Sequence, residues 1–293
     1  MRKESFQAAY QNIYEYFNNL SAKAFTTFDL SNIFENKRNS WKIASYRTAK
    51  HFNQYLENSE ILKVTTLKHQ STGSIKTILS KPNANYYDIA LTIKKDGYLS
   101  NYTAMSIHQL TLQIPKSIYI SFMKSDDGRN DNSNANLSQE SIDKAFSKPQ
   151  RVTSELYKSE LDNYRLFFIQ KGYSKKEIGV ETNKGIRYTD LERTLIDIAL
   201  RPAYSGGVFE VLEAYIKARD IVDTNKLYDY LNQLNYIYPY HQLIGFYLEK
   251  ANYEEDRYIM FYNDLSNFEF YLTYNISNKQ YNEKWKIYFP KGF

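Results

Sequence analysis

The sequence contains no cysteine, and this absence excludes disulfide bonds, a thiol nucleophile and thiolate metal ligands. No stretch approaches the roughly 18 apolar residues that a membrane-spanning helix needs. The charged start of the chain is not followed by the apolar core of a signal peptide. We therefore expect a soluble, cytoplasmic protein that makes no contact with a membrane.

Sequence motifs of the common catalytic sites are missing as well. There is no P-loop, no GxGxxG dinucleotide motif and no GxSxG nucleophile elbow. The four histidines lack the spacing of metal ligands; they are His51, His69, His108 and His241. We therefore predict that the chain uses no metal ion and no cofactor and has no catalytic residues.

Two classes of metal-dependent enzyme need a separate test. A nucleotidyltransferase of the toxin type requires a Gly-Ser pair followed shortly by two metal-binding carboxylates, but no acidic residue follows Gly73–Ser74 before Asp88. A nuclease with a D/E-x-K motif has one candidate triplet, from Glu35 to Lys37, near the end of an expected helix. We predict that the protein is not an enzyme, and we keep a nuclease at Glu35 and Lys37 as an alternative.

Positive charge is concentrated in the first part of the chain. Residues 1–82 contain 12 Lys and Arg against 6 Asp and Glu, a net charge of +6, whereas residues 83–293 contain 26 against 27, a net charge of −1. The overall charge of +5 therefore comes from the N-terminal part. Such asymmetry indicates that this part binds a polyanion and that the rest of the chain has another role.

Hydrophobic periodicity predicts three helices and a β-hairpin in the basic part. The helices are expected at residues 6–19, 29–35 and 46–58, and the strands at 61–68 and 74–79. Asp29 and Ser45 are the expected N-caps of the second and third helices, and the hairpin tip contains Gly73. This order is typical of a winged helix-turn-helix. We predict a winged-helix DNA-binding domain over residues 1–82 and a second domain over 83–293.

In a winged helix the third helix enters the major groove and the hairpin lies against the DNA backbone. Arg and Lys can hydrogen-bond to guanine and Gln to adenine, whereas any basic side chain can contact a phosphate. The base-contact candidates are Arg47, Lys50 and Gln54, with His51 at the rim, and the backbone-contact candidates are Lys37, Arg38, Lys42, Lys68 and Lys76. Two alternatives stay open, because a polar helix face can simply be solvated and winged helices also bind proteins.

The rest of the chain is predicted to be a mixed α/β domain. Helices are expected at residues 100–110, 225–234 and 239–250, and strands at 117–123, 165–170 and 187–189. Residues 87–93 fit a helix or a strand, and residues 125–138 are expected to form a mobile loop without a site. Apolar and polar residues alternate over 268–272 and 285–289, which predicts two strands of an antiparallel sheet.

Residues 185–218 are expected to form two consecutive amphipathic helices. Thr189 and Glu192 have the spacing of a capping box at the start of the first helix. Arg193 and Asp197 lie four residues apart on a face other than the apolar one, where an ion pair contributes roughly a few tenths of a kcal/mol. We interpret the charged residues of this stretch as fold or partner-interface residues rather than as a catalytic cluster; they are Glu192, Arg193, Asp197 and Arg201.

Three segments of the second domain occur in a characteristic order. They are YLSNYTAMSIHQLT at 98–111, then ERTLIDIALRP at 192–202 between RYT and YSGG, and YPYHQLIGFYLEKANY at 238–253. Together they resemble the C-terminal domain of AbiEi-type antitoxins, the regulator halves of type IV toxin–antitoxin systems that act in abortive infection and phage defence. The resemblance covers most of residues 85–293.

The resemblance implies an α+β fold in which a winged helix-turn-helix precedes a larger mixed α/β antitoxin domain. It also implies a transcriptional autorepressor that binds an inverted repeat in its own promoter DNA and opposes a nucleotidyltransferase-like toxin. Whether the antitoxin contacts this toxin directly stays open. The alternative is a protein-interaction module whose basic domain binds a partner protein and not DNA.

Overall fold

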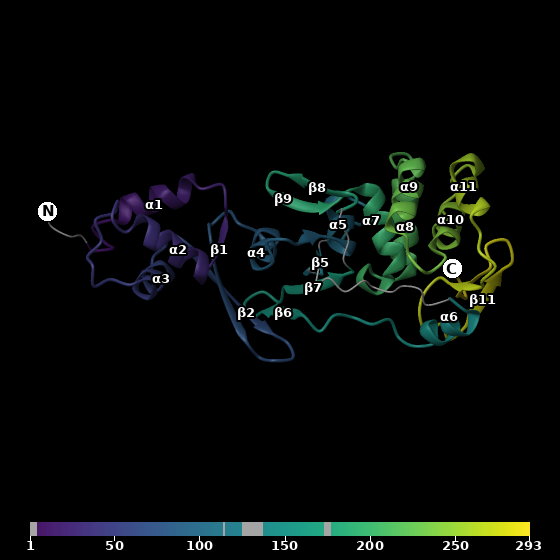
Figure 1. The fold of residues 1–293 in the computed structure, drawn as a ribbon, viewed down its shortest axis with the longest axis horizontal. Helices are drawn as coiled ribbons and strands as arrows, with labels where there is room; N and C mark the ends of the chain where they lie inside the picture. The colour runs from purple at the N-terminus through teal and green to yellow at the C-terminus, as the bar shows by residue number, and fades with distance from the viewer. Residues whose placement is uncertain (1–4, 114, 125–136, 173–176) are drawn as a thin grey trace.

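The computed structural model describes residues 5–113, 115–124, 137–172 and 177–293. Most of the loop expected at 125–138 lies outside these residues. Helices and a mixed sheet together form an α+β fold, as expected. The molecule is elongated, with the N-terminal helices at one end and the C-terminal helices and strands at the other (Figure 1).

The N-terminal elements follow one another in the expected order, with one additional short strand. They are α1 Tyr10–Asn19, β1 Ala24–Thr26, α2 Thr27–Lys37, α3 Ala49–Asn58, β2 Lys63–His69 and β3 Ile75–Ser80. The helices pack on the hairpin around buried aromatic rings, among them Phe17, Phe34 and Phe52. The ring centres of Phe34 and Phe52 are 5.2 Å apart, which joins α2 directly to α3.

Both predicted N-caps in this part are wrong. Thr26 caps α2: its hydroxyl accepts from the backbone N–H of Asp29 at 3.1 Å, and the Asp29 carboxylate accepts from the backbone N–H of Thr26 at 3.0 Å. Thr48, not Ser45, caps α3 by the same exchange with His51. A side chain three positions inside a helix can reach back to the N-cap, so Asp29 supports the start of α2 without being its first residue.

A single sheet runs through most of the molecule. In the described residues its strand order is β1-β3-β2-β6-β7-β5-β4-β9-β8. The strands not yet introduced are β4 Tyr98–Leu99, β5 Ser117–Met123, β6 Leu156–Ser159, β7 Arg165–Lys171, β8 Val180–Asn183 and β9 Ile186–Thr189. Neighbours are antiparallel, except that β5 is parallel to β7 and β4 to β9. Because β2 pairs with β6, the sheet continues across the expected boundary at residue 82, and the division into domains stays a prediction.

Helices cover this sheet and fill the C-terminal end of the molecule. They are α4 Tyr86–Ile93, α5 Asn101–Ile107, α6 Gln139–Phe146, α7 Leu191–Leu200, α8 Val208–Ala218, α9 Thr224–Leu234, α10 Tyr240–Lys250 and α11 Ile259–Asn263, with short 3-10 helices at Pro202–Tyr204 and Glu255–Arg257. The segment at 87–93 is helical, and Asn85 and Asp88 form a capping box at its start. Among the described residues, no helix combines the length and the apolar surface needed to span a bilayer.

The prediction for the C-terminal tail is wrong in one respect. β10 Phe270–Tyr271 and β12 Ile287–Pro290 pair as neighbours, but they run parallel. A further strand, β11 Lys279–Asn282, lies antiparallel to β12 on its other side. Alternation along a strand decides which face is buried and carries no information on the direction of its neighbour.

α7 and α8 form the expected helical hairpin, but the cap and the charged residues differ from the prediction. The N-cap of α7 is Asp190, which accepts from the backbone N–H of Arg193 at 2.9 Å, and not Thr189. Glu192 is therefore too close to the cap for a capping box, and it pairs with Lys226 of α9 at 2.7 Å. The ion pair between Arg193 and Asp197 is buried and does not lie on the surface of the helix.

Candidate nucleic-acid interface

The outer face of α3 is defined by the residues that the helix buries. Phe52 and Leu56 are 0 % exposed and belong to the N-terminal core. Residues on the opposite side of the helix therefore face outward. A shallow hollow on this side is lined by Ser5, Phe6, Gln7, Arg47, His51, Gln54, Tyr55 and Asn58. The structure thus brings three predicted contact residues together, and Lys50 is exposed on the same helix.

Arg47 lies just before α3 and is oriented by aromatic rings. Its guanidinium carbon is 5.4 Å from the centre of the Phe6 ring and 5.2 Å from that of Tyr46. Its Nε is buried and has no hydrogen-bond partner among the described residues. A guanidinium stacked on rings loses little freedom when it binds, so Arg47 has the geometry of a pre-oriented cation at the edge of the hollow.

Arg38 positions the segment that leads into α3. Its Nη2 donates to the backbone carbonyls of Ser45 at 3.0 Å and of Arg47 at 3.2 Å. Its guanidinium also lies over the Phe34 ring, 5.1 Å from the centre, and its Nη1 is 3.4 Å from a carboxylate oxygen of Glu35. These contacts occupy the guanidinium, so a phosphate bound at Arg38 would compete with them.

The other predicted contacts before and within α3 are Lys37 at the end of α2, Lys42 in the turn before α3 and His51 within α3. The Nζ of Lys37 is 5.0 Å from the centre of the Tyr16 ring, and Lys42 is exposed in the turn between α2 and α3, with a φ of 56°. His51 is exposed, but its Nδ1 accepts from the backbone N–H of Thr48 at 3.3 Å, so its ring is oriented by the helix cap. All three stay predicted contacts.

The hairpin tip is held in shape by the imidazole of His69. The backbone N–H of His69 donates to the carbonyl of Ser74 at 2.8 Å, and its Nδ1 accepts from the backbone N–H of Thr72 at 3.1 Å. Gly73 has a φ of +69°, a value that favours glycine in a turn of this kind. These hydrogen bonds within the turn therefore give the tip a defined shape.

Lys68 and Lys76 are both exposed near this tip, but they lie on opposite faces of the hairpin. Lys68 is opposite Ile75 in the strand register, whereas Lys76 is opposite Leu67. Consecutive residues of a strand point to opposite faces. The sequence predicts the same backbone-contact role for both lysines. Only the strand register shows that they lie on opposite faces of the hairpin.

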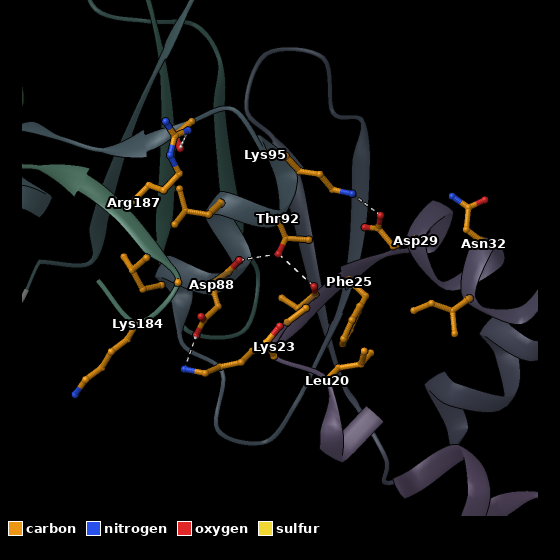
Figure 2. Close-up of a pocket in the computed structure, with 18 of the residues that line it drawn as sticks. Leu20, Lys23, Phe25, Asp29, Asn32, Asp88, Thr92, Lys95, Lys184 and Arg187 are labelled. Atoms are coloured by element: carbon orange, nitrogen blue, oxygen red, sulfur yellow. Dashed lines mark hydrogen bonds and ion pairs between the residues drawn. The ribbon is translucent and has the colours of Figure 1, made fainter. Parts of the chain in front are cut away.

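A separate cleft of about 580 Å³ lies between the N-terminal helices and the rest of the chain (Figure 2). Lys95, in the turn after α4, forms an ion pair with Asp29 of α2 at 2.5 Å, and Lys23 pairs with Asp88 of α4 at 3.8 Å (Figure 2). The Thr92 hydroxyl lies 2.8 Å from the backbone carbonyl oxygen of Asp88 in α4 and 3.3 Å from that of Ala24 in β1, so it bridges the two elements (Figure 2). These contacts join α4 to α2 and β1 and fix the position of the N-terminal helices on the sheet.

The electrostatics of the cleft support this structural role. Burial opposes ionisation of Asp29, but hydrogen bonds from Lys95 and Thr26 outweigh it and hold the pKa of the carboxyl below its usual value of 3.8. The residues of the Lys95–Asp29 pair are 66 positions apart, and no periodicity or motif indicates their contact. In the part of the chain that the structure describes, no group of His, Asp and Glu side chains has the arrangement of a metal site.

No protein-family model and no curated protein matches this chain. Its structure is similar to the crystal structure of the RV2827C protein from Mycobacterium tuberculosis, with a TM-score of 0.62 at 10 % sequence identity. The similarity covers 98 % of this chain and 92 % of that chain. The two proteins therefore share a fold over nearly their whole lengths.

Proposed function

We propose that the protein is a DNA-binding transcriptional regulator in which residues 1–82 form a winged helix-turn-helix. In this proposal α3 is the recognition helix and the β2–β3 hairpin is the wing. The observation that carries it is the hollow on the outer face of α3, where Arg47, His51 and Gln54 lie together in the part of the chain with a net charge of +6. Basic and amide side chains grouped on a helix and on the segment just before it can reach base edges and phosphates alike.

The proposed operator is an inverted repeat in the promoter of the protein's own operon, which makes the protein an autorepressor. The test is a titration of the full chain with a labelled duplex of its upstream DNA and with a random duplex of equal length, at two salt concentrations. We expect tighter binding of the promoter duplex and weaker binding of both duplexes at higher salt. Equal affinity for the two duplexes would reject the repressor and favour the protein-interaction module.

Two variants test the assigned contacts within the same titration. Gln54→Ala is expected to lose about 1–3 kcal/mol of the preference for the promoter, because it removes a base contact. The salt slope is the decrease in the logarithm of the binding constant per unit increase in the logarithm of the salt concentration. Lys68→Gln is expected to weaken binding to both duplexes alike and to lower the salt slope by about 1. Lys217→Gln, at an exposed position on α8, is the matched control and is expected to change neither quantity.

We also propose that the C-terminal region is the antitoxin of a cytoplasmic toxin–antitoxin system and opposes a nucleotidyltransferase-like toxin. The likeness to AbiEi-type antitoxins rests on three segments, and the helices within them, α5, α7 and α10, pack into one core. Co-expression with the product of the neighbouring gene is expected to restore growth that this product alone inhibits. A pull-down of the two purified proteins then decides whether the effect needs direct contact.

A further inference from the structure

A row of three exposed cations crosses the sheet next to the hairpin tip. Lys68 of β2 is opposite Lys158 of β6 in the strand register, and Lys158 is opposite Arg165 of β7. All three side chains are exposed and line one open depression with His69, Gln70, Glu160 and Asn163. Register partners project from the same face, and neighbouring strands are about 4.8 Å apart, so the row spans about 10 Å.

The charge of this row is not balanced within the protein. None of the three cations forms an ion pair with a carboxylate among the described residues, and Glu160 is the one acidic residue that lines the depression. Like charges directly opposite each other on neighbouring strands destabilise a sheet. A surface that keeps three such charges side by side is complementary to a polyanion.

The row lies on the same side of the sheet as the recognition helix proposed above. Val64 of β2 packs on the N-terminal core, together with Phe52 of α3. Residues 64, 66 and 68 share one face because side chains alternate along a strand. The opposite face is covered: Leu67, Tyr157 and Leu166 are buried there with residues of α4. The three cations therefore continue the surface that begins at α3.

We propose that Lys68, Lys158 and Arg165 bind the phosphate backbone of the same duplex that α3 contacts. This inference rests on the proposed function and extends its DNA surface beyond residue 82 into β6 and β7. A strand of B-DNA carries one phosphate per roughly 3.4 Å of helix axis, so a row of about 10 Å faces two or three phosphates. The contact is independent of base sequence, since these side chains reach the backbone and not the groove.

The experiment compares the full chain with the double variant Lys158→Gln/Arg165→Gln, using the promoter duplex and a random duplex over a series of salt concentrations. We expect the double variant to bind both duplexes about tenfold or more weakly at 0.1 M salt and to lower the salt slope by about 1.8, or 0.9 for each lost contact. The control Lys217→Gln/Lys291→Gln removes the same charge from exposed positions elsewhere. Thermal unfolding checks that both double variants fold as the unaltered chain does.

A salt slope equal to that of the control pair would overturn the inference while leaving the proposed function in place. A loss of affinity for the promoter duplex alone would also overturn it, because that result would mean that the three cations contact bases and not phosphates. If the unaltered chain bound neither duplex, the proposed function and this inference would fail together.

Discussion

Arg193 and Asp197 form an ion pair inside the C-terminal region, where their side chains are 2 % and 1 % exposed. The Nε of Arg193 lies 3.2 Å from Oδ1 of Asp197, and the Nζ of Lys171 approaches the same oxygen at 3.3 Å. Burial opposes ionisation of Asp197, but the two cations outweigh it and hold the pKa of the carboxyl below its usual value. The pair is internal because α5, α8, α9 and α10 all pack against α7.

Asp197→Asn is expected to lower the free energy of unfolding by about 3–5 kcal/mol, because it leaves the buried Arg193 and the partly buried Lys171 without their counter-charge. Replacing all three charged residues with apolar ones, as in Lys171→Met/Arg193→Met/Asp197→Leu, is expected to recover much of this loss, because no unpaired charge then remains. Urea unfolding followed by circular dichroism measures both free energies. A cost of about 1 kcal/mol or less for Asp197→Asn would instead fit a solvated pair.

Gly245 of α10 lies directly against the ring of Trp285, which is 0 % exposed. A Cβ at position 245 would overlap the indole ring and lie 3.1 Å from the Cβ of Phe261. Helix propensity favours Ala over Gly by about 1 kcal/mol, whereas overpacking a core costs about 1–3 kcal/mol. Gly245→Ala is therefore expected to be destabilising, as measured by urea unfolding.

The matched control for this prediction combines Gly245→Ala with Trp285→Leu. Trp285→Leu alone creates a cavity, and the methyl group that Gly245→Ala adds would then occupy part of it. We expect the cost of the double variant to be smaller than the sum of the two single costs. Strict additivity would mean that the methyl group and the indole ring do not compete for the same space.

Features that depend on near neighbours along the chain could be predicted from the sequence. The strand at 117–123 and the helix α10 lie within one residue of their expected bounds, because hydrophobic period is a local property. The outer face of α3 follows from the same period, and the structure brings Arg47, His51 and Gln54 to one hollow. The first residue of a helix is harder to predict from the sequence, since several neighbouring hydroxyl and carboxylate side chains can each act as the N-cap.

Features that depend on distant residues could not be predicted. Pairing of β2 with β6 sets Lys68 beside Lys158, and no pattern in either strand indicates that partner. The i, i+4 spacing of Arg193 and Asp197 predicts their contact but not their burial, which depends on the four helices that pack against α7. Strand direction in the tail depends likewise on how the chain returns between β10 and β12.

His241 is expected to make the free energy of unfolding decrease as the pH falls below 6.5, the usual pKa of histidine. Burial lowers the pKa of the imidazole, and nearby Asp264 offsets part of that effect. The unfolded chain therefore binds a proton at a higher pH than the folded one, so the free energy of unfolding falls as the pH drops below 6.5 and levels off below the folded-state pKa.

Urea unfolding of the unaltered chain and of His241→Gln between about pH 8 and pH 5 measures this contribution. Gln can keep a hydrogen bond to Asn232, whose Oδ1 lies 2.8 Å from the Nε2 of His241. The variant is expected to lose less stability than the unaltered chain over this range. Equal losses in both proteins would assign the pH dependence to other groups.

Asp29 and Lys95 are expected to contribute unequally to stability although they form one ion pair across the cleft. The Lys95 side chain is 70 % exposed, so Lys95→Ala is expected to cost at most about 1 kcal/mol. Asp29→Ala also removes the capping box with Thr26 and is expected to cost about 1 kcal/mol more. Urea unfolding of the two variants measures the difference, and equal costs would mean that the cap contributes nothing.

Arg38 has two candidate roles in DNA binding, and one pair of variants separates them. Arg38→Lys keeps the charge but cannot make the two hydrogen bonds to the carbonyls of Ser45 and Arg47. If Arg38 acts by positioning that segment, Arg38→Lys and Arg38→Gln weaken promoter binding alike and leave the salt slope unchanged. If it binds a phosphate, Arg38→Lys keeps most of the affinity and Arg38→Gln lowers the slope by about 1.

We expect the positioning result, because both carbonyls already accept from the Arg38 guanidinium in the free protein. The matched control is Lys42→Gln, an exposed cation in the adjoining turn. Its loss is expected to lower the salt slope by about 1 and to weaken promoter and random duplexes equally. The two residues lie close together in the sequence and carry the same charge, so a different response from each would show that orientation of the segment before α3, and not charge alone, determines promoter affinity.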